Sequence, residues 1–168
     1  MSPQEAAEWA NLSWNTSLYS VANRWLSRGF TPEQAEPWLT AFGGGPSDID
    51  LVDVAHAIMS AGFTEAEVKQ LWDDGWSIHE LHALAKLIKD GVDTADVREW
   101  VKLGPGIVRF HAKGWHNAGK TAADAKPWLD NNFVNADVVA RWMECHPRCA
   151  DPAVARRLAE TGVTPDQV

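Results

Sequence analysis

Hydrophobic residues recur along the chain at the spacing of an α-helix. Val68 and Leu71 follow Thr64 at the fourth and seventh positions, so they share one face of a helix. Glycines bracket this stretch at Gly62 and Gly75, each followed by a large apolar residue. A glycine in the left-handed conformation closes a helix, and the apolar residue after it packs back on the last turn. The stretch therefore predicts one short helix, capped by Thr64 and closed at Gly75.

The same pattern recurs over the whole chain. Twelve potential caps precede apolar residues at similar spacing, and the intervals between the caps average about 15 residues. The predicted helix starts are Ser2, Ser17, Thr31, Asp50, Thr64, Ser77, Asp93, Gly104, Thr121, Asn135, Asp151 and Thr164. Because helices this short are marginal alone, each must bury its apolar stripe against its neighbours. The pattern predicts an all-α fold without strands: an array of about eleven short helices in stacked hairpins, similar to an α-solenoid.

We expect this array to form a single domain over residues 1–168. Its longest run of helix-breaking residues, 43–47, contains three glycines and a proline and is expected to turn the chain. At the other end, residues 164–168 supply the cap, the first-turn proline and the first apolar residue of another helix. Two interpretations stay open: the chain is a fragment of a longer array, or this last turn docks on a partner.

Two segments of the chain share an internal proline. Both read Thr-x-x-[Gln/Asp]-Ala-x-Pro-Trp-Leu, and they begin at Thr31 and Thr121. The preceding segments, 24–30 and 109–115, also correspond by residue type, which indicates an old duplication. Each internal proline removes one helical hydrogen bond and pushes against the preceding turn. We therefore expect both helices to kink or to be confined to short pieces.

Ten tryptophans against a single tyrosine are the most unusual feature of the composition. Five tryptophans stand seven residues after a predicted cap, where other segments have leucine: Trp9, Trp38, Trp100, Trp128 and Trp142. We expect these five in the core. Trp25 and Trp72 lie one position further along and are expected to fill space between stacked helices. Trp76 and Trp115 follow a glycine and are expected to pack on the helix that the glycine closes.

The candidate interaction surface consists of Trp14, Asp73, Asp74, Trp76 and Trp115. Trp14 fits no position of the helical pattern, so it is either an exposed anchor or a packed residue. Asp73 and Asp74 lie at a helix C-terminus, where a negative charge is mildly unfavourable. The two aspartates are therefore either an interaction point or a solvated corner.

Charge disfavours nucleic acid as a partner. The chain holds 23 acidic and 15 basic residues and has a net charge of −8, which repels phosphate and favours a protein partner. No apolar run is long enough to span a membrane, and the N-terminus lacks the features of a signal peptide. Two cysteines give no disulfide framework. We expect a soluble, cytoplasmic protein that uses no cofactor and does not enter a membrane.

No group of side chains indicates catalysis. Cys145 and Cys149 lie four residues apart beside a histidine, and His111 or His116 could complete a zinc site. Two reduced cysteines at a helix end are the alternative. Residues 43–45 lack the Lys-Ser/Thr that completes a phosphate-binding loop. No nucleophile, base and orienting group can be assembled, so the sequence predicts no enzyme and no catalytic, cofactor-binding or metal-binding residue.

One segment resembles a known family. The 33 residues from Gly29-Phe-Thr-Pro-Glu-Gln-Ala to Gly62-Phe, with glycines at 43–45, resemble in outline one repeat of the TAL-effector-like proteins. Residues 163–168, Val-Thr-Pro-Asp-Gln-Val, resemble the start of another repeat. In that family two short helices flank a glycine-containing loop whose residues read DNA bases. The resemblance implies such a hairpin here, with Ala41 and Phe42 in place of the usual polar pair.

Two functions are compatible with these features. The first is a non-enzymatic helical-repeat scaffold that mediates protein–protein interaction. The alternative is a nucleic-acid-directed protein, either a DNA-contacting helical array or an acidic mimic of DNA. Acidic residues spaced like phosphates would favour mimicry. A continuous basic stripe would favour DNA contact, and its members would be Arg24, Arg28, Lys86, Lys89, Lys102, Arg109 and Lys113.

Overall fold

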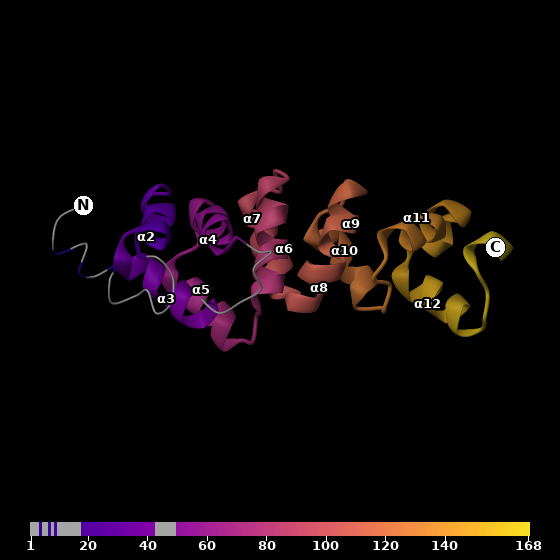
Figure 1. Ribbon diagram of the computed structural model, residues 1–168. Helices are drawn as coiled ribbons and strands as arrows, with labels where there is room; N and C mark the ends of the chain where they lie inside the picture. Colours follow the sequence, from indigo (N-terminus) through magenta and orange to yellow (C-terminus); the bar gives the residue numbers. More distant parts are fainter. Residues whose placement is uncertain (1–3, 5–6, 8, 10–17, 43–49) are drawn as a thin grey trace. The chain divides into compact units, whose positions relative to one another are not determined.

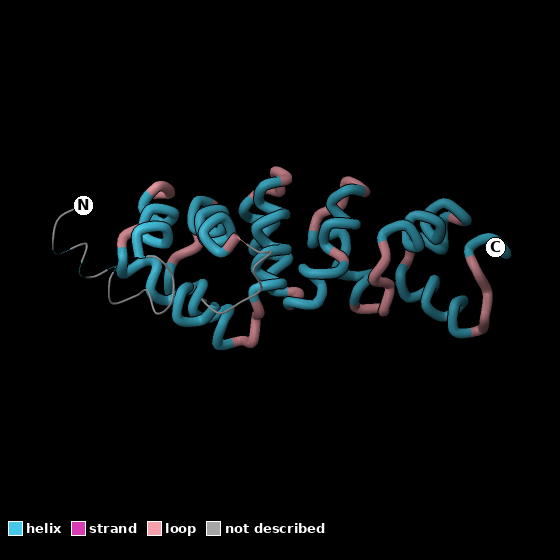
Figure 2. The backbone as a smooth tube through the Cα atoms, in the orientation of Figure 1, coloured by secondary structure: helices cyan, strands magenta, loops and turns pink. Residues whose placement is uncertain are grey.

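The regular structure of the chain is helical. The computed structural model describes residues 4, 7, 9, 18–42 and 50–168. Over these residues Figures 1 and 2 show helices joined by short turns and no strand. The prediction of an all-α fold is confirmed for this part of the chain. The turn predicted at 43–47 lies outside the described residues.

The chain forms two compact units, Met1–Lys86 and Leu87–Val168. The first unit holds α2 (Leu18–Leu26), α3 (Pro32–Phe42), α4 (Leu51–Ser60) and α5 (Glu65–Asp73). The unit boundary falls inside α6 (Ile78–Lys89). The second unit holds α7 (Thr94–Lys102), α8 (Pro105–Phe110), α9 (Ala112–Asn117), α10 (Ala122–Leu129), α11 (Ala136–Cys145), η1 (Pro147–Ala150), α12 (Pro152–Glu160) and η2 (Pro165–Gln167).

Helices begin where the cap pattern predicts. At α5 the Glu67 N–H donates to Thr64 Oγ1 at 3.2 Å, and the Thr64 N–H donates to Glu67 Oε2 at 2.7 Å. This reciprocal pair satisfies two backbone donors that the helix start leaves free. Ten predicted starts immediately precede a helix: Thr31, Asp50, Thr64, Ser77, Asp93, Gly104, Thr121, Asn135, Asp151 and Thr164. The other two, Ser2 and Ser17, lie outside the described residues.

The helices also end in a common way. Gly62 has a φ of +81°, its N–H donates to Met59 O at 2.9 Å, and the Phe63 N–H donates to Ile58 O at 3.4 Å. This pair of bonds satisfies carbonyls at the helix end and needs a residue in the left-handed conformation. The same pair recurs at six further closures, with the left-handed residue at Gly29, Gly75, Gly91, Gly119, Asn132 and Gly162. Asn132, with φ +64°, fills this position without being glycine.

Pro37 does not end its helix. α3 continues beyond it to Phe42 and is 11 residues long. At the sixth helical position the proline deprives a single carbonyl, that of Glu33, of its helical donor. Glu33 is exposed, so water can replace the lost bond. The second internal proline lies in the shorter α10, which is eight residues long.

Residues 105–119 differ from the predicted pattern. The sequence predicts one helix that begins at Gly104 and is closed by the glycine before Trp115, whereas α8 ends at Phe110 and α9 runs on to Asn117. Gly114 lies inside α9, and the left-handed residue is Gly119, with φ +70°. The correspondence between 24–30 and 109–115 therefore does not extend to the helix ends. A glycine before an aromatic residue does not by itself mark a closure.

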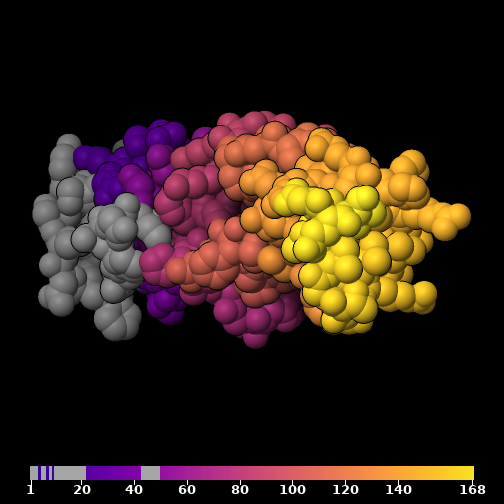
Figure 3. Space-filling view, turned by 90° about the vertical axis from the view of Figure 1, so that its right-hand side faces the viewer, coloured from indigo at the N-terminus to yellow at the C-terminus, as the bar shows by residue number. Residues whose placement is uncertain are grey.

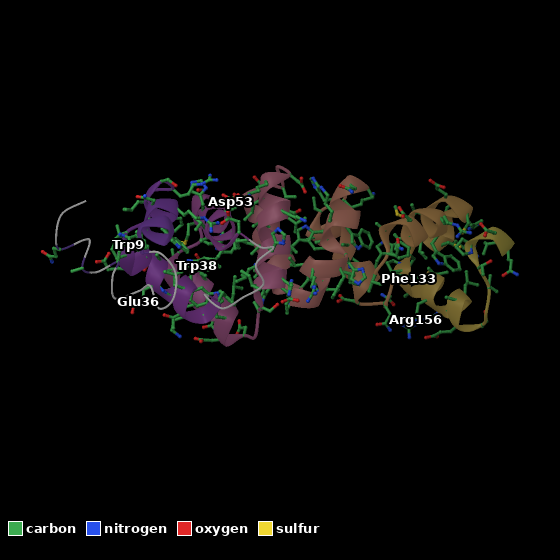
Figure 4. All side chains as sticks on the ribbon, viewed as in Figure 1. Trp9, Glu36, Trp38, Asp53, Phe133 and Arg156 are labelled. Atoms are coloured by element: carbon green, nitrogen blue, oxygen red, sulfur yellow. The ribbon has the colours of Figure 1, made fainter. Side chains whose placement is uncertain are left out.

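Tryptophans fill the core, as their spacing predicts. The five at the seventh position after a cap are buried, namely Trp9, Trp38, Trp100, Trp128 and Trp142. Trp25 is also buried and meets Phe30 edge to face at 4.9 Å. Trp72 joins α5 to α3, because its ring meets Trp38 at 5.3 Å. Figure 4 shows Trp38 pointing in among the helices of the first unit and Glu36 pointing outward. No polar or charged residue is buried in the described part of the chain.

Asp96 clamps α7 to the start of α10. One carboxylate oxygen accepts from Trp100 Nε1 at 3.0 Å, and the other accepts from the Ala122 N–H at 2.8 Å. A single side chain therefore satisfies a buried indole and a free backbone donor of a helix 26 residues away. The contact between α7 and α10 is fixed by polar as well as apolar contacts.

Other polar contacts span a similar distance in sequence. They join residues 23 to 26 positions apart: Arg24–Asp50, Arg28–Asp53, Asp90–Lys113, Asp96–Ala122, Asn131–Arg156 and Arg141–Asp166. The last of them attaches η2 to α11, and the C-terminal residues, yellow in Figure 3, lie on the surface of the second unit. Each contact ties an element to one that follows two or three elements later.

Replacing Trp100 tests the tryptophan core. The Trp100→Ala variant should lose about 3–5 kcal/mol of unfolding free energy, because a large buried side chain leaves a cavity. Urea denaturation measures this loss. The control is Phe110→Ala, which removes an exposed ring and should change stability by less than about 0.5 kcal/mol. A loss below about 1 kcal/mol for Trp100→Ala would place that side chain outside the core.

A pair of glycine substitutions tests the helix closures. Gly62→Ala should destabilise the protein by about 1–2 kcal/mol, because the left-handed conformation is unfavourable for alanine. Gly114→Ala should stabilise it by about 0.4–1 kcal/mol, because Gly114 lies inside α9 and a Cβ there meets open space. Thermal unfolding of both variants measures whether each substitution raises or lowers the stability of the protein. Equal shifts in the same direction would contradict the assignment of the two positions.

Candidate interaction surfaces

Two of the five predicted surface residues belong to the core. Trp76 has 5% of its surface exposed and Trp115 has 1%, so neither can present its ring to a partner. Trp76 follows the left-handed Gly75, and its N–H donates to Leu71 O at 3.0 Å. Its role is the packing contact expected after a helix closure. Trp76 and Trp115 are therefore not part of the candidate surface.

Trp115 is buried for a different reason. It lies in the middle of α9, and its indole Nε1 donates to Val134 O at 3.0 Å. The residue in the packing position after the true closure is Lys120, whose N–H donates to Trp115 O at 3.0 Å. The glycine directly before Lys120, ahead of the Thr121 cap, is the sequence signal that identifies this closure. Trp14 lies outside the described residues.

Asp73 and Asp74 lie on the surface at the end of α5. Lys69 Nζ pairs with Asp73 at 2.8 Å, and Gln70 Nε2 donates to Asp74 at 2.8 Å. Both partners come from the preceding turn of the same helix, and such exposed contacts are weak. The two carboxylates are thus locally satisfied yet accessible to a partner.

Phe110, at the end of α8, is the most exposed large apolar residue in the described chain, with 67% of its surface exposed. The Arg109 guanidinium lies 4.9 Å from the centre of its ring, and the His111 ring lies 6.4 Å away. The internal correspondence pairs Phe110 with the buried Trp25, so sequence reasoning missed its exposure. The sequence did contain a signal of this difference. Trp25 stands closer to the next predicted cap, Thr31, than Phe110 does to its next cap, Thr121.

Charge is divided unevenly between the two units. Residues 1–86 hold 12 acidic and 4 basic residues and carry the whole net charge of −8, whereas residues 87–168 hold 11 of each. Within the second unit, residues 97–123 hold five basic residues and one acidic residue. Phe110 lies at the middle of this segment. Two of these five basic residues, Lys102 and Lys113, are paired with Glu99 and Asp90.

The basic residues proposed as a DNA-binding stripe are largely engaged with carboxylates. Four of the seven form ion pairs, which are Arg24–Asp50, Arg28–Asp53, Lys102–Glu99 and Lys113–Asp90. A cation paired with a carboxylate contributes less to phosphate binding, because the pair must first be opened.

A polar pocket lies between α2 and α4. Its volume is about 180 Å³, and it is lined by Arg24, Ser27, Arg28, Asp50, Val52 and Asp53. Burial would raise the pKa of Asp50, but hydrogen bonds from Arg24 and the Asp53 and Val52 N–H groups outweigh burial and lower it. Because each arginine already pairs with an aspartate, the pocket offers no uncompensated charge to a ligand.

Cys145 ends α11, and Cys149 lies in the following η1. Cys149 is buried, and Cys145 is half-buried with its thiol donating to Trp142 O at 3.2 Å. Burial raises the pKa of the Cys149 thiol, and hydrogen bonding to Cys145 raises it further. In the described part of the chain no three His, Cys, Asp or Glu side chains gather as metal ligands do. His111 and His116 belong to α8–α9 and not to this pair.

Comparisons with protein-family models, curated proteins and solved structures gave no match. Among the described helices, none combines the length and the apolar character that crossing a membrane requires.

The two thiols should differ in reactivity. Alkylation of the native protein by iodoacetamide at about pH 8 should modify Cys145 first, because the thiolate is the reactive form and Cys149 is buried with a raised pKa. Mass spectrometry of the digested protein measures each site, and unfolding in urea should remove the difference. Equal rates in the native protein would contradict the burial of Cys149.

Proposed function

We propose that this chain is a non-enzymatic helical-repeat scaffold that binds another protein. The helices would stack as hairpins in an α-solenoid-like array. Recurrent closures after a left-handed residue support this arrangement, as do polar contacts that reach 23 to 26 residues along the chain. In such arrays each unit contacts its neighbours, and an extended surface is left for partners.

The exposed Phe110 is the observation that carries the proposal. Aromatic residues, phenylalanine included, and arginine are enriched in protein interfaces relative to the rest of the surface. Phe110 exposes 67% of its surface, and the Arg109 guanidinium lies over its ring. Burying this ring in a partner's pocket would remove apolar surface from water and bring a cation to the contact. The two free cysteines suit the reducing conditions of the cytoplasm.

A specific observation favours the alternative, a nucleic-acid-directed protein. Five basic residues of the segment 97–123 lie on either side of Phe110 in the sequence, and an exposed aromatic ring can stack on the bases of a single strand. Against it stand the net charge of −8 and the ion pairs of Lys102 and Lys113. The DNA-reading positions implied by the TAL-effector-like resemblance, Ala41 and Phe42, are the last residues of α3.

Capture from the native lysate tests the scaffold proposal. The wild-type chain should retain specific proteins, and Phe110→Ala should lose them, because the truncation removes the apolar anchor. Quantitative mass spectrometry compares the two captures. Met143→Ala is the matched control, since Met143 is an exposed apolar residue on another helix, and it should retain the same proteins. Proteins retained equally by all three chains would contradict the assigned surface.

A measurement of binding between the purified protein and random-sequence nucleic acid distinguishes the nucleic-acid function from the scaffold function. Tight binding to duplex or single-stranded DNA at about 50 mM salt, lost at about 200 mM, would favour the nucleic-acid function. We expect no such binding by the wild-type chain.

A further inference from the structure

The chain turns sharply between its two cysteines. Cys145 is the last residue of α11, and Pro147 cannot continue that helix because its nitrogen carries no hydrogen. His146 is extended, and its carbonyl accepts from the Cys149 N–H at 2.8 Å. The ring Nδ1 of His146 accepts from the Arg148 N–H at 3.1 Å. These bonds hold η1 in a tight turn, and η1 packs against α11.

This turn brings the two sulfur atoms together. The Cys149 thiol is hydrogen-bonded to Cys145, and the Cys145 thiol donates in turn to Trp142 O at 3.2 Å. Both thiols are free in the structure. Two sulfur atoms must lie close together before a disulfide can form without moving the backbone, and hydrogen-bonded thiols meet this condition.

The two thiols differ in exposure in a way that suits stepwise oxidation. Cys145 is half-buried, so a small molecule can reach it from solvent, whereas Cys149 has 2% of its surface exposed. An oxidant therefore meets Cys145 first, and Cys149 can react with the product formed on its neighbour. Redox-sensitive sites commonly combine an accessible thiol with an adjacent thiol that resolves the first product.

We propose that Cys145 and Cys149 form a reversible disulfide by exchange with a low-molecular-weight disulfide such as oxidised glutathione. The Cys145 thiolate attacks one sulfur of that disulfide, which forms a mixed disulfide and releases one glutathione thiolate. The Cys149 sulfur then attacks the Cys145 sulfur and releases the second glutathione. Two protein thiols are oxidised and one glutathione disulfide is reduced to two thiols, which take up the two protons that the cysteines lose.

The disulfide acts at the junction of α11 with the elements that follow it. η1 packs on α12 as well as on α11, so a bond at Cys149 ties this junction to the end of α11. Oxidation also removes the thiol hydrogen that Cys145 donates to Trp142 O. It therefore exchanges a hydrogen bond within α11 for a covalent link between α11 and η1. This site is independent of the proposed scaffold function, which concerns Phe110.

Treatment of the folded wild-type chain with oxidised glutathione tests the disulfide. At about 10 μM protein, about 1 mM oxidised glutathione and about pH 8, the chain should stay monomeric, lose two hydrogen atoms and resist later alkylation at both cysteines. Trypsin cleaves after Arg148, between the two cysteines, so mass spectrometry should find the peptides 142–148 and 149–156 joined. Dithiothreitol should separate the two peptides.

Two single variants test the order of attack. Cys149→Ser should retain one glutathione on Cys145, because the thiol that would displace it is missing. Cys145→Ser should react with oxidised glutathione at least about tenfold more slowly than Cys149→Ser, because its remaining thiol is buried. Circular dichroism checks that each variant is folded.

The wild-type chain decides the proposal even where a variant does not fold. Stable glutathione adducts without joined peptides would overturn it, as would unchanged thiols. Joined peptides found only in disulfide-linked dimers, or only after unfolding in urea, would also overturn it. Equal rates for folded Cys145→Ser and Cys149→Ser would contradict the assignment of Cys145 as the attacking thiol.

Discussion

The structure depends on one conformational constraint, the left-handed residue that closes each of seven helices in the described chain. At Gly62 two backbone bonds end α4, and within two residues Thr64 begins α5. The end of α4 and the start of α5 are thus encoded by almost adjacent residues, and only a short turn separates the two helices. The helices that result are too short to be stable alone. Tryptophan suits this situation, because one ring at the seventh position buries much apolar area against two neighbouring helices.

Much of this fold could be predicted from the sequence, because its signals are local. Capping and closure act within four or five residues, so Thr64 and Gly62 could be assigned without knowledge of distant contacts. The burial of Trp38 and Trp100 followed from their distance to a cap. Asn132 shows the limit of this approach, since it adopts a conformation that glycine usually supplies and no glycine marks its position. The prediction at Gly114 failed because glycine is tolerated inside a helix, and the closure lies instead at Gly119, two residues ahead of the Thr121 cap.

The candidate site was harder to predict, because exposure depends on which face of a helix remains uncovered. Phe110 follows an arginine, as the buried Trp25 does, yet α8 leaves its ring in solvent. Trp76 and Trp115 are buried, in agreement with the packing expected of them and not with their place in the candidate surface. The partner of Asp96 was also hidden, because the Ala122 N–H lies 26 residues away and no local pattern encodes that bond. The uneven division of charge was readable in the sequence, but it acquires meaning only once the unit boundary is known.

The reach of the polar contacts has a consequence for how the chain acquires its structure during synthesis. Arg24 meets Asp50, and Arg141 meets Asp166, so these residues find their partners within the next two or three elements of the chain. Proteins dominated by such local contacts fold rapidly, because little loop entropy is lost before contacts form. A helix leaving the ribosome needs only the next two or three elements to emerge before its partners are present. Folding can then keep pace with translation, and little apolar surface waits unprotected for residues that have yet to be made.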